Sequence, residues 1–347
     1  MRPRVNRSAI LTSTESERNQ RRKHGNRGTE VFLHVPMRIS PLRFPTLNCY
    51  PSMNERRKFH LRLPTRTLML GERTLVMGVL NVTPDSFSDG GTFLEPRRAV
   101  EHALEMEKAG ADLLDIGGES TRPGSTGTPV ETELARILPV LEGLRGVLKI
   151  PISIDTRKSQ VAEAAISAGA QIINDISGLR CDPRIAEVAA RRGVPLILMH
   201  MRGEPGTMQK KPFARDVMKD VTLGLRASIA KAQKAGVRKS QIIIDPGIGF
   251  GKSFEQNYEL LRKLPELAKL GYPLLVGTSR KGFLGATLAR NGKPAPPEER
   301  LWATAATVTA SVLGGAHIVR VHDVAEMAQV ARVADCLLGS AGRRNFR

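Results

Sequence analysis

Polar side chains follow each of eight short apolar runs in this chain of 347 residues. They are of two kinds: acceptors such as carboxylates and amides, and cations. Carboxylate and amide oxygens suit a ligand edge that bears several N–H groups, whereas arginine, lysine and histidine suit anions. One polar heterocycle plus one phosphate-like group is therefore indicated. The residues are Asn81, Asp115, Thr121 with Arg122, Asp155 with Arg157, Asn174 with Asp175, Met199 with His200, Asp245, Ser279-Arg280-Lys281, and Arg320 with His322.

Two of these runs lead into glycine-containing segments, 81–91 and 115–124. The first ends in a glycine pair that permits large backbone excursions, so we expect it to close over a ligand. In the second, glycines bring the backbone close to a ligand, and Thr121 with Arg122 can hold an anion.

A single aspartate or histidine at a strand end often caps a helix instead of binding a ligand, and Asp155 or Asp182 could do so. Capping does not explain why Asn81, Lys281 and Arg320 all follow strands of the same predicted sheet. The sequence contains no HExxH motif, no CxxC motif and no clustered carboxylates, so we expect no metal cage built by the protein. Magnesium could still arrive with a diphosphate.

The apolar runs recur about every 30 to 40 residues and alternate with segments of helical spacing, a repeat typical of β/α units. Continuous apolar strands indicate burial on both faces, as in a parallel sheet. Eight units favour a (β/α)8 barrel over an open doubly wound sheet, because the first strand lacks a phosphate-loop or dinucleotide fingerprint. The predicted strands are 75–80, 112–116, 152–155, 171–176, 195–200, 241–245, 273–278 and 316–322, and the clearest helices are 96–109, 131–148, 159–168 and 214–235.

The amino-terminal part carries much of the formal charge of +19. Residues 1–70 hold 15 lysines and arginines against 4 acidic residues and show no sustained apolar period. We predict a basic, disordered extension over 1–57 and one barrel domain over 58–347, which begins with a β-hairpin whose arm 59–63 pairs back after a turn at Gly71-Glu72. A start codon placed too far upstream, a cleaved organelle-targeting peptide and a nucleic-acid-binding arm all remain possible explanations of the extension.

Three widely spaced cysteines favour neither a disulfide framework nor a zinc site and suit a reducing, cytoplasmic setting. No apolar run is long enough to cross a bilayer. We expect no nucleic-acid partner, because aromatic residues make up 4% of the chain and no RNA-binding signature occurs. A lone tryptophan, Trp302, is expected to serve packing.

Eight strings in this order resemble dihydropteroate synthases, a family of pterin-binding barrels. They are LNVTPDSFSDGG, GGESTRPGS, ISIDTRK, IINDISG, LMHMRG, DPGIGFGK, GTSRKGF and RVHD, and they extend from residue 80 to residue 323. The first two strings are highly specific. The resemblance implies an enzyme that joins 4-aminobenzoate to 6-hydroxymethyl-7,8-dihydropterin diphosphate, with Mg2+ as its ion, a homodimeric state and sensitivity to sulfonamides.

The resemblance also implies roles for individual residues. Asn81 would contact Mg2+ and the diphosphate, and Arg320 with His322 would hold the diphosphate. Four residues would hold the pterin: Asp155, Asn174, Asp245 and Lys281. Thr121 and Arg122 would lie near the leaving group and the aminobenzoate, and Met199, Phe250 and Ser279 complete the predicted substrate-binding set. The predicted catalytic residues are Asp155, Lys281, Arg320 and His322.

Two enzymatic alternatives share the barrel. A methyltransferase acting between a methylated tetrahydrofolate and a corrinoid protein would use the same pterin-binding aspartates and asparagine. That reaction has no diphosphate to stabilise, so the synthase is favoured by four residues together: Asn81, Lys281, Arg320 and His322. A non-catalytic pterin-binding paralogue is the other alternative.

Overall fold

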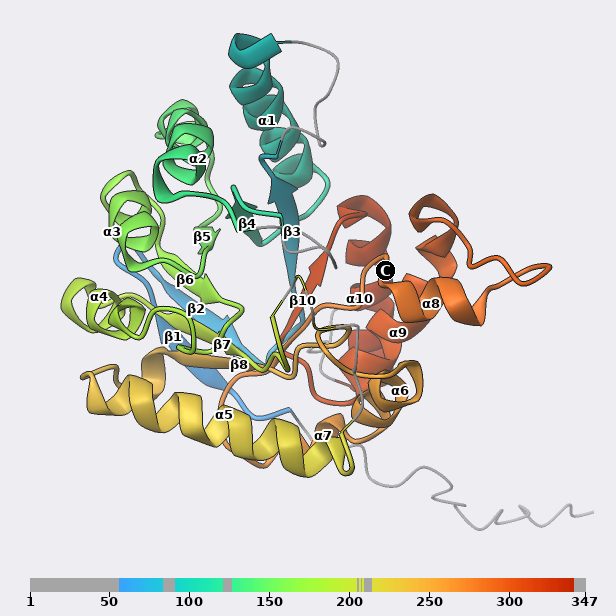
Figure 1. Cartoon of the computed structure of the whole chain (residues 1–347). Coiled ribbons are helices and arrows are strands. Elements are labelled where there is room, and N and C mark those ends of the chain that lie inside the picture. The colour runs from blue at the N-terminus through green and yellow to red at the C-terminus, as the bar shows by residue number, and fades with distance from the viewer. Residues whose placement is uncertain are drawn as a thin grey trace, which may run out of the picture. The chain divides into compact units, whose positions relative to one another are not determined.

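Eight parallel strands surrounded by helices form the centre of the molecule (Figure 1). A computed structural model describes residues 56–83, 91–120, 127–204, 206, 208 and 214–339. The strand order is β8-β7-β6-β5-β4-β3-β10-β9. A parallel bridge between Ile244 and Leu274 joins the two ends of this order, so the sheet closes into the predicted (β/α)8 barrel. The strands are β3 (Leu75–Asn81), β4 (Leu113–Gly117), β5 (Ile152–Asp155), β6 (Ile172–Asp175), β7 (Leu196–Met199), β8 (Ile242–Asp245), β9 (Leu275–Val276) and β10 (Ile318–Val321).

Helices follow the strands and cover the outside of the barrel (Figure 1). Their ends carry ordinary signals: the side chain of Asp216 accepts from the backbone N–H of Lys219 at the start of α5, and Ser253 with Gln256 forms a capping box at the start of α6. The helices are α1 (Gly91–Lys108), α2 (Val130–Leu144), α3 (Ser159–Ser167), α4 (Arg184–Arg192), α5 (Val217–Lys234), α6 (Phe254–Arg262), α7 (Leu264–Ala268), α8 (Gly282–Thr287), α9 (Leu301–Leu313) and α10 (Val324–Leu337), with 3-10 turns η2 (Lys239–Gln241) and η3 (Pro297–Arg300). Within the described ranges, none of these helices is both long and apolar enough to cross a membrane.

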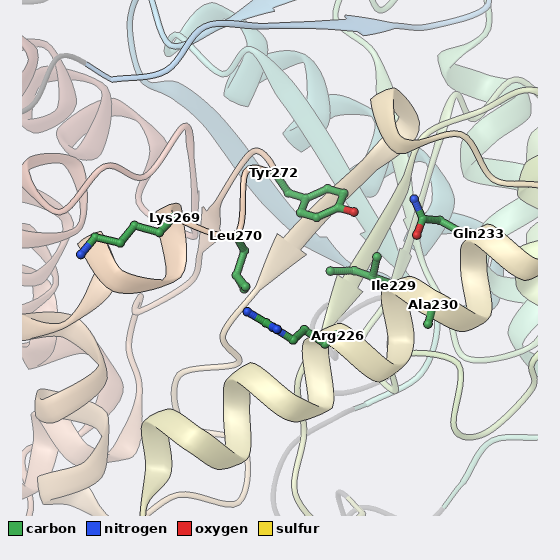
Figure 2. A pocket seen from close by; sticks show the side chains of 7 residues that line it. All are labelled: Arg226, Ile229, Ala230, Gln233, Lys269, Leu270 and Tyr272. Atoms are coloured by element: carbon green, nitrogen blue, oxygen red, sulfur yellow. The ribbon is translucent and has the colours of Figure 1, made fainter.

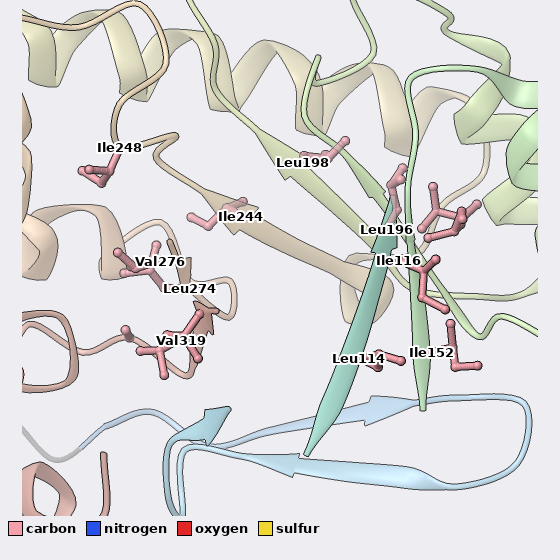
Figure 3. Close-up of a cluster of buried hydrophobic side chains, with 14 of the residues drawn as sticks. Leu114, Ile116, Ile152, Leu196, Leu198, Ile244, Ile248, Leu274, Val276 and Val319 are labelled. Atoms are coloured by element: carbon pink, nitrogen blue, oxygen red, sulfur yellow. The ribbon is translucent and has the colours of Figure 1, made fainter. Parts of the chain in front are cut away.

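The core has two layers because side chains on a strand alternate between its faces. Outward-facing residues such as Leu196, Leu198 and Ile244 pack against the helices (Figure 3). The inner layer fills the amino-terminal half of the barrel with buried side chains from seven strands, two of them, Leu75 and Met77, from β3. The others are Leu113, Ile172, Ile197, Ile243, Leu275 and Ile318.

A β-hairpin closes the amino-terminal end of the barrel. It pairs β1 (Phe59–Arg62) with β2 (Thr67–Leu70), and Leu61, Leu63 and Leu70 join the inner core layer. Figure 3 shows the hairpin beneath the starts of the strands. The hairpin was predicted, but its predicted turn at Gly71-Glu72 is wrong: the chain turns at residues 63–66, where Leu63 N–H donates to Arg66 O at 2.7 Å and Pro64 has the φ that a turn needs.

Contacts with the barrel begin before the hairpin. Arg56 is buried, and its guanidinium donates to Asp335 Oδ1 of α10 at 2.5 Å and to Thr74 Oγ1 at 2.9 Å. Arg57 O accepts from His317 Nε2 at 2.8 Å. These two arginines lie just before the predicted domain boundary at residue 58, so ordered contacts start earlier than expected. Residues 1–55, to which the predicted disorder refers, lie outside the described residues.

Candidate active site

The inner face of several strands changes from apolar to polar along its length. On β10, Ile318 belongs to the inner core layer and Arg320, two residues later, is polar. The same step occurs on β4, β6 and β8, and β5 carries Ser153 and then Asp155. Because residues two apart on a strand share a face, the polar groups lie next to the inner core layer, on its side towards the carboxyl ends of the strands. The apolar and polar pairs are Leu113 with Asp115, Ile172 with Asn174, Ile243 with Asp245, and Ile318 with Arg320.

Arg320 connects the polar groups of four strands. Its Nε donates to Asp115 Oδ2 at 2.6 Å, and Nη2 donates to Asp155 Oδ2 at 2.9 Å. Asn174 Nδ2 donates to the same Asp115 oxygen at 2.9 Å. Two buried acceptors, Asp115 Oδ1 and Asn174 Oδ1, have no hydrogen-bond partner within the described structure. Buried polar atoms are normally satisfied, so a ligand with N–H groups fits this place.

Asp115 was noted at the end of its strand but was not among the predicted site residues. It is fully buried and contacts both Arg320 and Asn174, so it belongs to the same network. The signal in the sequence is a carboxylate inside the otherwise apolar strand 113–117, where a buried charge needs a partner.

Burial changes the protonation of the charged groups in the barrel mouth. It raises the pKa of Asp155, an effect that the Arg320 guanidinium opposes. It also raises the pKa of Asp245 to about 6, opposed by the N–H of Gly247 and the charge of Lys281. Burial lowers the pKa of Lys281 to about 8. Near neutral pH the mouth therefore holds groups that can gain or lose a proton when a charged ligand binds.

Lys281 and Phe250 form one wall of the mouth. The Lys281 ammonium lies 4.0 Å from the centroid of the Phe250 ring, within the range of a cation–π contact. Phe250 packs in a small apolar cluster that includes Met199 and Ile176. A flat heterocycle that binds beside Asp245 would thus meet a cation backed by apolar side chains.

Ser279 and His322 form a pair at the ends of β9 and β10. Ser279 Oγ accepts from the His322 backbone N–H at 3.1 Å and lies 3.0 Å from His322 Nδ1. Ser279 Oγ can donate its proton to Nδ1, and in that tautomer the hydrogen of a neutral ring lies on Nε2. Burial lowers the pKa of His322 to about 3, and Arg320 and Arg280 act in the same direction. His322 is therefore a neutral imidazole near pH 7, able to act as a hydrogen-bond donor but carrying no charge.

Four polar residues of the sequence-based set of strand ends face elsewhere. His200 faces α5, where a Cβ on Gly224 would lie 2.4 Å from the imidazole. Asp175 accepts from the backbone N–H groups of Ser177 and Leu179. Arg157 pairs with Glu119, and Arg280 pairs with Asp323. These side chains hold loops and helices in place.

Three predicted ligand-binding residues need separate mention. Asn81 ends β3 and is half-buried, opposite Gly117 and on the level of Asp155. Thr121 and Arg122 lie outside the described residues. No group of three or more His, Cys, Asp or Glu side chains that could hold a metal occurs among the described residues.

A separate hollow of about 270 Å³ lies on the outside of the barrel, between α5 and the turn before β9. Figure 2 shows Arg226, Ile229 and Gln233 of α5 facing Leu270 and Tyr272 across it. None of the predicted site residues lines this hollow, so the barrel mouth remains the candidate active site.

Comparison with known proteins identifies the family of this chain. Residues 77–322 match the model of the pterin binding enzyme family. A dihydropteroate synthase of Synechocystis sp. is 51% identical over 267 residues, which are 77% of this chain and 91% of that protein. A Xanthomonas albilineans dihydropteroate synthase in complex with 7,8-dihydropteroate has a TM-score of 0.71 and 42% identity, covering 80% of this chain and 98% of that one. A Yersinia pestis dihydropteroate synthase with a sulfonamide drug complex has a TM-score of 0.75 and 42% identity, covering 81% and 100%.

A closed barrel with acceptors and cations gathered at its mouth is the arrangement of a barrel enzyme that acts on a small polar molecule. The chain belongs to the family of pterin binding enzymes. Relatives at 51% and 44% identity, from Synechocystis sp. and Escherichia coli, are dihydropteroate synthases, as the eight strings predicted.

Proposed function

We propose that this chain condenses 4-aminobenzoate with 6-hydroxymethyl-7,8-dihydropterin diphosphate to give 7,8-dihydropteroate and diphosphate, a step of folate biosynthesis. The observation that carries this assignment is the network of Arg320 with Asp115, Asp155 and Asn174, which holds two unpartnered acceptors inside a barrel mouth that also contains Lys281. Relatives of the same family bind 7,8-dihydropteroate and a sulfonamide drug.

The pterin binds among Asp155, Asn174, Asp245 and Lys281. The amino group and ring N–H of a pterin suit carboxylate and amide acceptors, and the unpartnered Asn174 Oδ1 provides one of these. Binding by a ligand that satisfies buried atoms also gives specificity, because an analogue without the matching N–H leaves them unpaired.

The diphosphate binds near Arg320, Lys281 and His322. Arg320 contacts two carboxylates, and these contacts fix the direction of its guanidinium. The guanidinium stabilises the anion that binds beside it. His322 donates from Nε2, and its ring is held by Ser279. Met199 and Phe250 supply the apolar surface of the same wall.

The reaction starts with cleavage of the bond between the pterin methylene carbon and the diphosphate oxygen. The electron pair leaves with the diphosphate and positive charge develops on the methylene carbon. Carboxylates at the pterin end and cations at the other end both favour this separation of charge. The amine nitrogen of 4-aminobenzoate then bonds to the carbon and releases one proton to solvent. No side-chain nucleophile takes part.

Magnesium fits the donor set as an ion that arrives with the substrate. Mg2+ prefers oxygen ligands and commonly keeps water and substrate phosphate oxygens while using one or two protein ligands. Asn81 provides one such oxygen at the end of β3, and it is the residue we assign to the ion. When bound, the ion would neutralise charge that develops on the leaving diphosphate.

The test is diphosphate release measured with and without 4-aminobenzoate, and again with a sulfonamide as competitor. We expect 7,8-dihydropteroate only when both substrates are present, and less of it with the sulfonamide. Binding of both substrates without product would instead identify a non-catalytic pterin-binding protein. Transfer of a methyl group from a methylated tetrahydrofolate to a corrinoid protein would identify the methyltransferase alternative.

We also propose that the enzyme is a cytoplasmic homodimer. The free thiols of Cys181 and Cys336 suit a reducing compartment.

Apolar side chains are exposed on two helices that pack together: Trp302 on α9 is 80% exposed, and Val333 and Leu337 share one face of α10. Trp302 therefore makes little contact within the described chain, and packing against a second copy would bury it. Sedimentation of the protein and of a Trp302→Ser, Val333→Ser variant should show a dimer and a monomer, respectively.

A further inference from the structure

Lys252 has no assigned contact with substrate, yet its side chain is fully buried. It lies after β8 at the end of the segment 246–252. Its Nζ donates to His200 O and to Phe250 O, both at 3.0 Å. Because His200 directly follows β7, a single ammonium joins the loops that follow two neighbouring strands.

Glycines let this segment press against the backbone beside it. A Cβ on Gly247 would lie 1.9 Å from His200 O, and a Cβ on Gly251 would lie 2.0 Å from Arg202 O. Both glycines have a φ of +66°, which other residues rarely adopt. The close approach brings the His200 carbonyl within reach of Lys252.

The same segment forms part of the mouth of the barrel. Phe250, one of the two residues whose carbonyl Lys252 contacts, has Lys281 Nζ 4.0 Å from its ring centroid. Gly249 also contacts Lys281, since a Cβ there would lie 3.0 Å from Lys281 Cδ. A change in the position of this segment would therefore move the surface against which Lys281 rests.

A buried ammonium is a costly way to fill space. An apolar side chain of similar length would pack without the cost of removing a charge from water. The presence of a lysine here therefore indicates that its two hydrogen bonds to backbone carbonyls matter. Burial lowers the pKa of Lys252 to about 7, and the carboxylates of Asp245 and Asp220 oppose this. The cation therefore lies within the electrostatic range of a pterin-binding carboxylate.

We propose that Lys252 is a positioning residue for pterin binding, whose ammonium holds the carbonyls of His200 and Phe250 together and keeps the Phe250 ring against Lys281. This inference rests on the proposed function, because Lys281 and Asp245 act there on the pterin diphosphate. Lys252 itself does not touch the substrate.

The experiment measures the dissociation constant of 6-hydroxymethyl-7,8-dihydropterin diphosphate by titration calorimetry for the wild type and Lys252→Met. We expect binding to weaken about tenfold, because small displacements of positioning groups have effects of this order. The matched control is Val140→Ala. This substitution leaves a cavity in the core where α2 packs on the barrel, and it removes no contact in the barrel mouth. Its affinity should stay within about twofold of the wild type, as for a loss of stability alone. Lys252→Gln, which keeps an N–H donor, replaces Lys252→Met if that variant does not fold.

A double-mutant cycle with Phe250→Leu tests the route. If Lys252 acts through Phe250, the two losses of affinity will be clearly less than additive. Additive losses, or an affinity of the Lys252 variant equal to that of Val140→Ala, would overturn the proposal. Turnover is measured in parallel: a wild type that binds the pterin diphosphate but forms no 7,8-dihydropteroate refutes the proposed function, and the affinities still decide the role of Lys252.

Discussion

Arg320 shows how individual residues set the charge of the barrel mouth. Its guanidinium lies between Asp115 and Asp155, and its own pKa is raised by those carboxylates although burial opposes this. A buried carboxylate beside a fixed cation can remain charged without water. When the substrate binds, these contacts already point the cation and the carboxylates in the directions that charge separation needs.

Replacement of Asp155 by asparagine tests this arrangement. Asparagine keeps the shape but removes the negative charge that favours a cation on the pterin methylene carbon, so kcat should fall about a hundredfold. The midpoint of thermal unfolding should change little, because burial raises the pKa of Asp155 and disfavours its charged form in the folded state. Steady-state kinetics and a thermal melt check both parts. Activity equal to that of the wild type would remove Asp155 from the catalytic residues.

The pH dependence of kcat/KM for the pterin diphosphate should be bell-shaped. Asp155 and Asp245 must both be ionised, and burial raises the pKa of Asp155 to about 7 and that of Asp245 to about 6, so the rate should fall as the pH drops below about 7. Lys281 must be protonated, so the rate should fall again above about pH 8. Lys281→Arg should shift the alkaline limb upward, because a guanidinium keeps its proton. A flat profile between pH 5 and pH 9 would contradict these assignments.

At the scale of elements, the loop after β8 lies directly against the backbone of the loop after β7. The contact leaves no room for a side chain at Gly247. Gly247 N–H donates to Asp245 Oδ1 at 2.7 Å, so the position of this loop is connected to the direction of a carboxylate that we propose binds the pterin. The barrel strands fix where the loops start, and the glycines allow the loops to approach each other.

Gly247→Ala should weaken pterin binding. It should also lower the free energy of unfolding by more than a positive φ alone would, because the added Cβ meets His200 O. The control is Gly146→Ala, since Gly146 has a φ of +79° but no atom within 4 Å of an added Cβ. We expect the control to lose about 1 to 2 kcal/mol from the unusual φ alone. Gly247→Ala adds a steric conflict with His200 O and should lose more. Equal losses in denaturant unfolding would show that the close approach does not matter.

At the scale of the whole molecule, the amino-terminal end of the described chain is joined to its last helix through the base of the barrel. Arg56 and Asp335 form a buried ion pair, and Thr74 donates to Asp335 from both N and Oγ1 at 2.7 Å. His317 adds a second connection through Arg57 O, and burial lowers the pKa of His317 to about 4, so its ring is neutral near pH 7. The base is thus stabilised by residues far apart in sequence, while the mouth provides the chemistry.

Arg56→Met should lower the free energy of unfolding by about 3 to 5 kcal/mol, because it leaves the Asp335 carboxylate buried without its cation. Denaturant unfolding provides the measurement. The double variant Arg56→Met, Asp335→Asn should lose less, since asparagine can still accept from Thr74 and carries no charge. If the double variant were as unstable as the single one, an uncompensated charge would not be the cause. Pterin affinity should be unchanged in both, because the pair lies at the opposite end of the strands.

The sequence by itself determined the barrel, its strands and the polar groups at their carboxyl ends, because alternating β/α units and period-two side chains follow from local pattern. It also indicated Asn174, Asp245 and Lys281 as neighbours in one mouth. Only the tertiary structure decided which of two adjacent residues faces inward, as with Met199 and His200, because that depends on where each strand ends and which helix covers it. The structure also decided that Arg320 contacts Asp115 and that Lys252 joins two loops, since such contacts connect residues that no local pattern relates.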